Sequence, residues 1–217
     1  MIKLENTDVY GFEAAIRGMR NPWNSWEKSD SVMLPTEKII EVGPNDLTLM
    51  KKLVSAGTDH SKFMRMIYVT VDITAPLYWW KEFDTYKVGT VRNSCSTMHT
   101  ITDKEFTLGD FSQEHLTPYS FALLTNIIEL LNYYRKDYLS KGLYDEVRKM
   151  DWWQIIQLLP SSYNQRATVQ LNYAVLRNMY HSRKNHRLDE WRDFCRWIET
   201  LPYSELITGG NADEMQP

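Results

Sequence analysis

The stretch that most restricts the fold of this chain is MRMIYVTVDIT, at residues 64–74. Apolar and polar side chains alternate along it, and most of them are β-branched or aromatic. This period of two predicts a β-strand with one buried face. Ala75 and Pro76 follow directly, and the aromatic-rich segment from there to about Tyr86 is predicted to be a helix. A strand that leads straight into a helix indicates a chain that mixes both kinds of element.

The rest of the chain continues this mixture. We expect a short strand at 2–5, extended stretches at 88–101 and 163–171, and irregular segments at 20–42 and 102–116. Predicted helices cover residues 9–19 (capped by Thr7-Asp8), 43–57, 118–140, 142–158, 172–184 and 188–200. No boundary stands out, so we expect one α/β (α+β) domain over residues 1–207, with a mixed sheet packed with helices, and a disordered tail over 208–217.

The longest predicted helix carries an apolar stripe at helical spacing. Its members are Leu123, Ile127, Leu130, Leu131 and Tyr134. Pro160 is expected to stop the helical run that follows.

Composition restricts the partners and the cellular compartment that we expect for this protein. The 217 residues carry a formal net charge of −3, so no global basic field favours nucleic acid as a partner. No apolar run is long enough to span a bilayer, and the first residues lack the pattern of a signal peptide. Two cysteines, Cys95 and Cys195, cannot form a disulfide framework. We therefore expect a cytoplasmic protein with two free thiols and no membrane partner.

Aromatic residues are abundant, with 8 Trp and 13 Tyr, several of them adjacent in sequence. Large aromatic side chains most often fill a core or a subunit interface. They also form stacking surfaces for planar ligands, and the sequence alone leaves both interpretations open.

Read without any family, the chain shows no strong catalytic motif. There is neither a glycine-rich phosphate loop nor a paired-cysteine zinc signature. His181 and His186 are five residues apart, a poor spacing for two ligands on one helix face, so no metal site is predicted.

One predicted helix carries polar groups at a suggestive spacing. Asn172 and Arg183 are eleven residues apart, close to three turns, with Leu176 and Met179 between them on the same face. Such a face suits a ligand with an apolar floor beneath it. The competing interpretation is an exposed arginine that interacts with the dipole at the helix end.

Two further segments are ambiguous. Residues 183–187 (RKNHR) form a basic run that either meets a phosphate or is a solvated turn between helices. Residues 90–97 (TVRNSCST) are dense in hydroxyls, and they either line a polar pocket or form a strand edge that faces water.

Residues 53–98 resemble the flavin-dependent thymidylate synthases. That family shows a helix, a Gly-His step, a strand, an Ala-Pro or similar step and an aromatic helix, followed by Arg-His-Arg-x-x-Ser-x-Asn-x-x-Ser-x-Arg. Here LVSAGTDH (53–60), FMRMIYVTVDIT (63–74) and APLYWWKEFD (75–84) match without gaps, and the signature falls on TYKVGTVRNSCST (85–97). In the second half, Leu159-Pro160, Asn172, Asn178 and Arg183 also match the family pattern.

The resemblance implies a homotetramer with sites between subunits. It implies a methyltransferase and oxidoreductase of nucleotide biosynthesis, which uses FAD, NADPH and methylenetetrahydrofolate to convert dUMP to dTMP. Arg183 would be the catalytic residue and would hold the pyrimidine. The implied FAD-binding residues are His60, Tyr86, Lys87, Asn172 and Asn178. The implied nucleotide-binding residues are Thr90, Arg92, Cys95, Thr97 and Arg183.

The signature itself is largely rewritten. Thr85, Tyr86 and Lys87 stand where Arg-His-Arg is expected, and Lys87 keeps a charge without the planar fork of a guanidinium. Cys95 and Thr97 replace a serine and an arginine that help to hold the nucleotide phosphate. Arg92, Lys184 and Arg187 are candidate replacement cations.

Three hypotheses follow. The first is a flavin enzyme acting on a pyrimidine deoxynucleotide by one-carbon or hydride transfer. The second is a non-catalytic oligomeric protein that binds a nucleotide or a partner and has lost the flavin chemistry. The third is an enzyme with a changed substrate.

Overall fold

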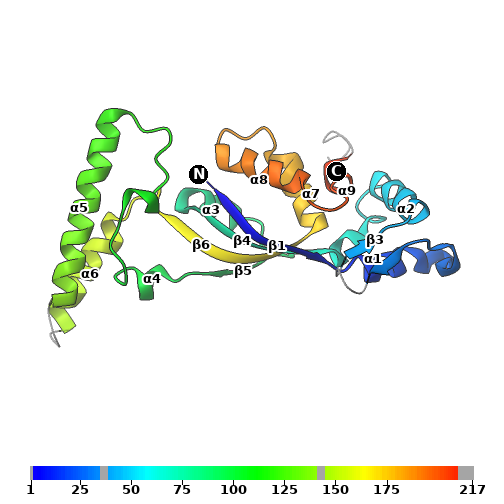
Figure 1. Ribbon diagram of the computed structural model, residues 1–217, viewed down its shortest axis with the longest axis horizontal. Helices are drawn as coiled ribbons and strands as arrows, with labels where there is room; N and C mark the ends of the chain where they lie inside the picture. The colour runs from blue at the N-terminus through cyan, green and yellow to red at the C-terminus, as the bar shows by residue number, and fades with distance from the viewer. Residues whose placement is uncertain (1, 35–38, 141–144, 210–217) are drawn as a thin grey trace. The chain divides into compact units, whose positions relative to one another are not determined.

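The computed structural model describes residues 2–34, 39–140 and 145–209. It contains a four-stranded sheet in the order β1-β4-β6-β5, formed by Lys3–Tyr10, Tyr68–Pro76, Asn164–Asn172 and Val91–Ser94 (Figure 1). Leu77 N bonds to Tyr163 O (3.0 Å) and Tyr173 N to Ile67 O (3.0 Å), so β4 and β6 run antiparallel. The fold is thus a mixture of helices with an antiparallel sheet, where we expected a mixed sheet.

Strand β4 confirms the alternation that the sequence shows. Val69, Val71, Ile73 and Ala75 are fully buried, whereas the residues between them are partly exposed. The predicted strand began too early, because Lys62–Met66 form a 3-10 helix (η3) that buries Phe63 and Met64. The following helix, α3 (Leu77–Phe83), is shorter than predicted and buries Trp79, Trp80 and Phe83.

The predicted helix over 9–19 is wrong at its start. Strand β1 continues through Thr7 and Asp8 to Tyr10, and helix α1 covers Phe12–Arg20. Gly11 makes the junction with a φ of 97°, and a Cβ there would lie 2.1 Å from Met66 O. Only glycine fits this contact and this backbone conformation. Pairing of β1 in the sheet therefore outweighs the capping tendency of Thr7 and Asp8.

The segment 20–42, predicted to be irregular, contains ordered elements. Asn21–Trp23 (η1) and Trp26–Lys28 (η2) are 3-10 helices, and β2 (Val32–Leu34) pairs antiparallel with β3 (Ile39–Glu41). Helix α2 (Pro44–Ser55) starts next to Gly43, as predicted. Asp46, in the first turn of α2, accepts hydrogen bonds from Arg20, Ser29 and Ser31 and so holds these residues against α2.

The chain divides into two compact units. Unit 1 contains residues 1–3, 73–85 and 93–167, and unit 2 contains residues 4–72, 86–92 and 168–217. The expectation of a single domain over 1–207 stays a prediction.

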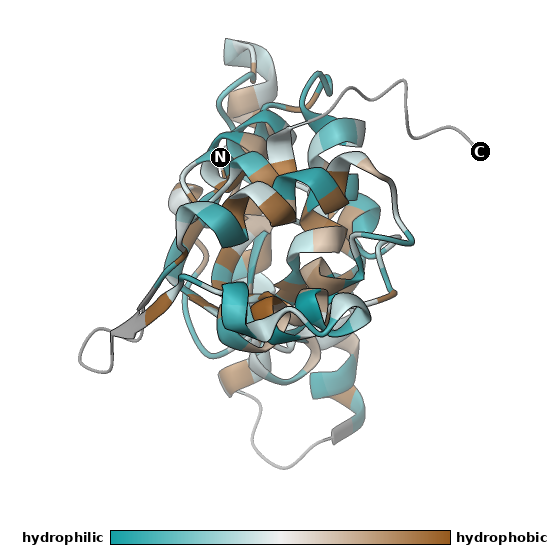
Figure 2. Cartoon of the chain, turned by 90° about the vertical axis from the view of Figure 1, so that its right-hand side faces the viewer, coloured by the Kyte–Doolittle hydropathy of each residue, from teal (hydrophilic) through white to brown (hydrophobic). Residues whose placement is uncertain are grey.

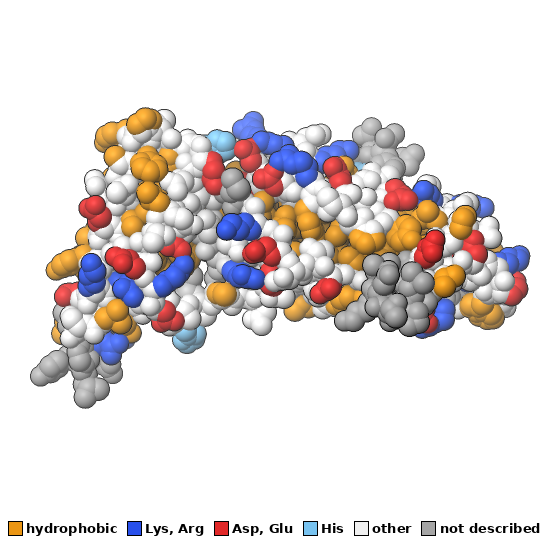
Figure 3. Space-filling model, in the orientation of Figure 1, with side chains coloured by type: hydrophobic (Ala, Val, Ile, Leu, Met, Phe, Trp, Pro, Cys, Tyr) orange, Lys and Arg blue, Asp and Glu red, His pale blue; other side chains and the backbone are white. Residues whose placement is uncertain are grey.

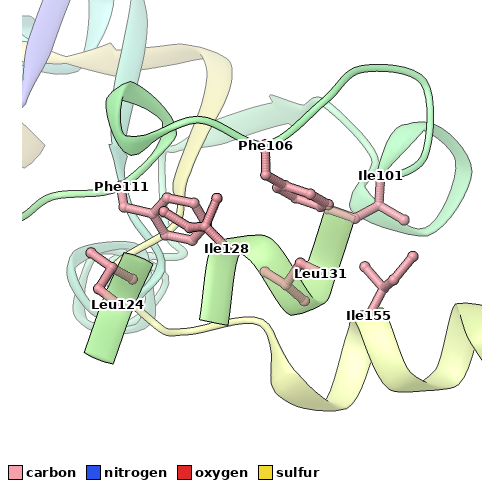
Figure 4. Packing of buried hydrophobic residues seen from close by; sticks show 7 residues of the cluster. All are labelled: Ile101, Phe106, Phe111, Leu124, Ile128, Leu131 and Ile155. Carbon is pink, nitrogen blue, oxygen red and sulfur yellow. The ribbon is translucent and has the colours of Figure 1, made fainter. Parts of the chain in front are cut away.

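In unit 1, two helices pack side by side: α5 (Pro118–Ser140) and α6 (Asp145–Leu158) (Figure 1). Before them come α4 (Thr97–Thr100) and η4 (Leu108–Asp110), so most of the stretch predicted as extended over 88–101 is not strand. Figure 4 shows the apolar cluster between α5, α6 and the segment 101–111. Its buried members are Ile101, Phe106, Phe111, Leu124, Ile128, Leu131 and Ile155.

The boundaries of α5 were predicted correctly, and its buried face was predicted in part, because Leu131 of the predicted stripe is buried and Ile127 and Tyr134 pack against the cluster. Leu124, Ile128 and Leu131 are buried, whereas Leu123 and Leu130 of the predicted stripe are 54% and 41% exposed. Helix α5 is apolar on more than one side, so periodicity alone did not select the side that meets the cluster.

In unit 2, helices α7 (Tyr173–Arg183), α8 (Asp189–Glu199) and α9 (Glu205–Thr208) pack against one another. Figure 2 shows single helices that change from teal to brown around their turns, the pattern of amphipathic helices at a core. Trp191, Phe194 and Ile198 of α8 are fully buried.

The predicted tail begins inside α9, at Thr208. Gly209 N donates to Glu205 O (3.0 Å), which closes this short helix. Residues 210–217 lie outside the described residues. None of the helices in the described ranges is long and apolar enough to cross a membrane.

Candidate functional site

In unit 2, the predicted site residues Arg183 and Tyr86 are brought together. Arg183 is the last residue of α7, and its Nε donates a hydrogen bond to the Tyr86 hydroxyl at 2.9 Å. Its guanidinium carbon lies 4.9 Å from the centre of the Trp191 ring and 5.6 Å from that of Tyr86. The two rings meet edge to face at 6.0 Å. A half-buried cation is thus held between two aromatic rings.

Neither of the two interpretations of Arg183 drawn from sequence describes this arrangement fully. Arg183 does lie at a helix C-terminus, where a cation interacts well with the dipole. It is also half-buried and oriented by Tyr86 and Trp191, so its position is well defined. Leu176 and Met179 are fully buried in the core of unit 2, so they are not an open apolar floor beside Arg183.

Asn172 caps the helix that carries Arg183. Its Oδ1 accepts from Val175 N at 3.0 Å, and the side chain is buried. A Cβ on Gly89 would lie 2.8 Å from Asn172 Nδ2, so the turn before β5 packs closely onto this amide. These contacts give Asn172 a structural role, which the eleven-residue spacing did not reveal.

In the segment 86–92, some of the predicted site residues are exposed to solvent and others are partly buried. Lys87 is exposed, and Val88 beside it is 90% exposed. Within the described part of the chain, the buried hydroxyl of Thr90 has no hydrogen-bond partner. A buried hydroxyl without a partner is costly and often marks a place where a ligand or a water binds. Arg92 is half-buried.

His60 and Asn178 both face solvent. His60 lies in the turn after α2, where its backbone N–H donates to Gly57 O. Asn178 lies in the middle of α7 and accepts a hydrogen bond of 3.4 Å from Ser182. The hydrogen bonds of His60 and Asn178 are thus made within their own segments, whereas Arg183 bonds to Tyr86.

Cys95 and Thr97, the last two predicted residues, line a cavity of about 460 Å³ in unit 1. Cys95 is an exposed free thiol, whereas Cys195 is a buried free thiol whose pKa burial raises to about 12. The cavity also contains Lys104, Asp110, Tyr163 and Arg166.

In this cavity, Lys104 and Asp110 shift each other's pKa. Lys104 Nζ bonds to Asp110 Oδ1, and this contact raises the pKa of Lys104. Burial opposes ionisation of Asp110, but its bonds with Lys104 and Thr107 outweigh that effect and hold the pKa of Asp110 below its usual range. Burial raises the pKa of the Tyr163 hydroxyl, which therefore stays protonated at neutral pH.

Reasoning from sequence missed Trp191, Lys104 and Arg166. Trp191 lies on the buried face of α8, a face that its helical period does signal, but its contact with Arg183 depends on how α7 and α8 pack. Arg166 lies in β6 on the face opposite Ala167 and Val169, as strand alternation predicts. No pattern in the sequence pairs Lys104 with Arg166 at one cavity.

Comparison with solved structures identifies the fold. Thymidylate synthase X from Helicobacter pylori, crystallised with FAD and dUMP, matches with a TM-score of 0.65 and 15% identity over 95% of this chain and 96% of that one. A second structure of this flavin-dependent thymidylate synthase, also with FAD and dUMP, matches with a TM-score of 0.63 and 15% identity over 94% and 95% of the two chains. No protein-family model and no curated protein sequence matches the chain. The protein therefore has a fold like that of the flavin-dependent thymidylate synthases.

Proposed function

We propose that this protein is a divergent FAD-dependent enzyme that acts on a pyrimidine deoxynucleotide, converting dUMP to dTMP or performing a related one-carbon or hydride transfer. The observation that carries this proposal is the shared fold over 95% of the chain with a protein whose structure contains FAD and dUMP. Tyr86 of the rewritten signature accepts a hydrogen bond from Arg183 of α7. This contact between two matched positions supports a retained site.

The residues present fit FAD in part. His60, Lys87 and Asn178 are exposed and carry groups that donate hydrogen bonds to a flavin or its phosphates. Asn172 does not fit a direct contact, because it is buried and its oxygen caps α7. FAD, when bound, would supply the hydride chemistry, which explains why the chain needs no nucleophile of its own.

Arg183 is the residue proposed to orient the pyrimidine. A guanidinium donates hydrogen bonds to a ring carbonyl and stabilises negative charge that develops on the ring. The Tyr86 hydroxyl and the Trp191 ring hold it at a defined place, so little side-chain freedom is lost when the substrate binds. The hydroxyl of Thr90 and the side chain of Arg92 are proposed to contact the nucleotide as well.

Three further features belong to the same proposal. NADPH and methylenetetrahydrofolate are the co-substrates if the activity of the fold relatives is retained. The protein is proposed to be a cytoplasmic homotetramer with sites between subunits. Exposed apolar side chains on α5 are consistent with such an assembly, and Figure 3 shows apolar side chains gathered over this helix.

The second candidate is a binding protein without flavin chemistry. Two observations favour it: Asn172 is engaged as a helix cap, and the Nε of Arg183 is engaged with Tyr86. Thr85 and Tyr86 also lack the charges that the signature would place there.

Titration with FAD, followed by its visible absorption, separates the two candidates. Uptake of FAD, together with dUMP-dependent oxidation of NADPH, supports the enzyme. A protein that stays colourless at saturating FAD contradicts it and leaves the binding protein.

Arg183→Ala tests where the substrate binds. Loss of a hydrogen bond from a charged group costs about 1.5–3 kcal/mol, so we expect dUMP affinity to fall by roughly 10–100-fold. The matched control is Arg196→Ala on α8, because Arg196 is exposed and pairs with Asp193. Equal dUMP affinity in both variants would show that Arg183 does not hold the substrate.

A further inference from the structure

The short helix α9 packs against α7 in unit 2 (Figure 1). Leu206 and Ile207 of α9 are fully buried in the core of this unit. A helix of four residues is too short to be stable by itself, so α9 depends on this contact. The α7–α9 contact is therefore a place where the chain can open locally while the rest of unit 2 stays folded.

Arg177 bonds the end of α9 to the middle of α7. Its Nη1 donates hydrogen bonds to Leu206 O (3.3 Å), to Ile207 O (3.1 Å) and to Gly209 O. The last carbonyl groups of a helix have no partner within the helix, so a side chain or water must satisfy them. Here one guanidinium does so, and it fixes the end of α9 to α7.

His181 lies one turn beyond Arg177 on the same side of α7, because the two residues are four positions apart. Both ring nitrogens of His181, Nδ1 and Nε2, are enclosed, and neither has a hydrogen-bond partner among the described residues. An enclosed polar atom without a partner is costly, and the cost rises when the ring gains a charge. The surroundings of the ring therefore suit its neutral form better than its charged form.

The charges around His181 also oppose its protonation. Partial burial of the ring lowers the pKa of His181, and the cations Arg177 and Lys184 lower it further. The backbone oxygens of Ile207 and Gly209 act in the opposite direction, so the ring lies beside carbonyl groups that Arg177 holds. A positive charge on His181 would thus lie close to a second cation at the end of α9.

Other charged or titratable groups lie on the elements that pack against α7. They are Lys62 and Arg65 of η3, Cys195 and Glu199 of α8, and Glu205 of α9. Glu199 accepts a hydrogen bond from Tyr180, and Glu205 pairs with Lys51. Burial raises the pKa of the Cys195 thiol to about 12. Carboxylates ordinarily titrate near about pH 4 and lysines near about pH 10, so a measurement between about pH 5.5 and pH 7.5 reports on histidine.

We propose that the α7–α9 contact is a pH-sensitive switch, in which protonation of His181 releases α9 from α7. In the open form water surrounds the ring, and its pKa is near the ordinary value of about 6.5. In the closed form the pKa is lower, so the open form takes up the proton first and is favoured as pH falls through about 6.5. The effect levels off below the pKa of the closed form. Helix α7 ends at Arg183, so the switch acts on the helix that carries the candidate site, but it does not rest on the proposed function.

Amide hydrogen exchange in the full chain tests this switch. The N–H groups of Ile207, Thr208 and Gly209 are hydrogen-bonded only while α9 is formed. Their protection, corrected for intrinsic exchange rates, is compared at about pH 7.5 and pH 5.5. We expect it to fall at least about threefold at the lower pH, within the limit of tenfold per pH unit that one proton sets. Protection of Val69 and Val71 in β4, an internal control in the same unit, is expected to stay unchanged.

Two variants and a matched control assign the effect to His181. Neither His181→Gln nor His181→Phe can take up a proton, so protection of α9 should be the same at both pH values in each. The phenylalanine leaves no polar atom to enclose, and it covers the case in which the glutamine amide destabilises α9 by itself. His99→Gln, which removes an exposed histidine of α4 in unit 1, is expected to keep the full response.

A direct titration of His181 provides a second readout. The NMR signals of its ring, assigned by their absence in His181→Gln, should titrate below about pH 6.5. The proposal is overturned by titration at or above that value, or by protection of α9 that does not fall on acidification. A fall that remains in either His181 variant also overturns it, because another group, such as His186 in the turn after α7, would then cause the response. None of these assays uses flavin or nucleotide, so their outcome is independent of the proposed enzyme.

Discussion

Arg20 and Asp46 form a salt bridge of 2.7 Å between side chains that are 5% and 0% exposed. Arg20 also donates to the backbone oxygens of Ser25 and Lys28, and Asp46 accepts from Ser29 and Ser31. One buried pair therefore fixes residues 25–31, between α1 and α2, through hydrogen bonds. A buried pair of this kind is costly to break, because the remaining partner becomes an uncompensated charge.

We expect Arg20→Ala to lower the free energy of unfolding by about 3–5 kcal/mol in urea denaturation. Arg17→Ala is the matched control, since Arg17 lies in the same helix and pairs with Glu13 at the surface. Loss of that exposed pair should cost less than about 1 kcal/mol. Similar losses in the two variants would show that the buried pair contributes no more than a surface one.

The same network predicts a pH dependence. Burial opposes ionisation of Asp46, but the hydrogen bonds from Ser31, Ser29 and Arg20 outweigh that effect and keep its pKa below the usual value. In the unfolded chain, the pKa of an aspartate side chain is about 3.9. The stabilisation is therefore present above that pH and is lost as pH falls through the lower pKa of the folded state.

Urea denaturation between pH 7 and pH 3 measures this effect. The difference in unfolding free energy between the native chain and Asp46→Asn should stay level down to about pH 5 and shrink below about pH 4. Asp193→Asn, which alters a surface pair with Arg196, should show a small difference throughout. A difference for Asp46→Asn that grows on acidification would contradict the pKa direction.

At the scale of elements, helix α7 depends on the turn that packs against its first residues. Asn172 caps the helix, and Gly89 lies against Asn172 with a φ of +76°. A Cβ at Gly89 would also lie 3.1 Å from Val175 Cγ2. The turn before β5 and the N-terminus of α7 thus fix each other's position, and α7 ends at Arg183.

Gly89→Ala and Gly57→Ala separate backbone strain from this packing. Both glycines have positive φ, but nothing lies within 4 Å of a Cβ built on Gly57. In each variant the left-handed backbone conformation of alanine costs roughly 1 kcal/mol of stability. Only Gly89→Ala adds a steric clash with Asn172. We expect the Gly89 variant to lose about 1–2 kcal/mol more in urea denaturation. Equal losses would mean that the turn moves away from α7 at little cost.

At the scale of the whole molecule, helices α5 and α6 carry apolar side chains that are exposed to solvent. Tyr119 is 84% exposed, Tyr133 is 60% exposed and Met150 is 65% exposed. Exposed apolar side chains that form a contiguous patch often mark an interaction site. A second copy of the chain is the partner that the proposed homotetramer requires.

Light scattering coupled to gel filtration tests the assembly. The native chain is expected to elute at about four times its mass of 25.7 kDa, and Tyr133→Glu is expected to lower that mass because it buries a charge at the contact. Trp23→Glu is the control, since Trp23 is an exposed aromatic residue of unit 2, 63% exposed. A native mass of one chain would show that the tetramer prediction is wrong.

Secondary structure was predicted correctly from the sequence where a single local pattern dominates. The alternation in β4 and the boundaries of α5 are confirmed, because each follows from a strong and uninterrupted pattern. Errors arose where two local signals compete. Thr7 and Asp8 look like a helix cap, yet hydrogen bonding in the sheet keeps them in β1.

The candidate site was predictable only in part. The spacing between Asn172 and Arg183 left two interpretations open, and the resemblance to the family selected Arg183 as a site residue. The structure places Arg183 between Tyr86 and Trp191. The roles predicted for His60, Lys87, Thr90 and Arg92 stay predictions. The spacing did not show that Asn172 caps its own helix, because a cap depends on backbone geometry at one residue.

The sequence by itself determined the kinds of element, the strand that leads into an aromatic helix and the resemblance to flavin-dependent thymidylate synthases. These properties follow from the order of residues along the chain, which periodicity and spacing describe directly. The tertiary structure alone decided which side of α5 is buried, the partners of Arg183, and the meeting of Lys104, Cys95 and Arg166 at one cavity. The physical reason is that such contacts join residues far apart in sequence, and packing and hydrogen bonding bring them together only when the chain folds.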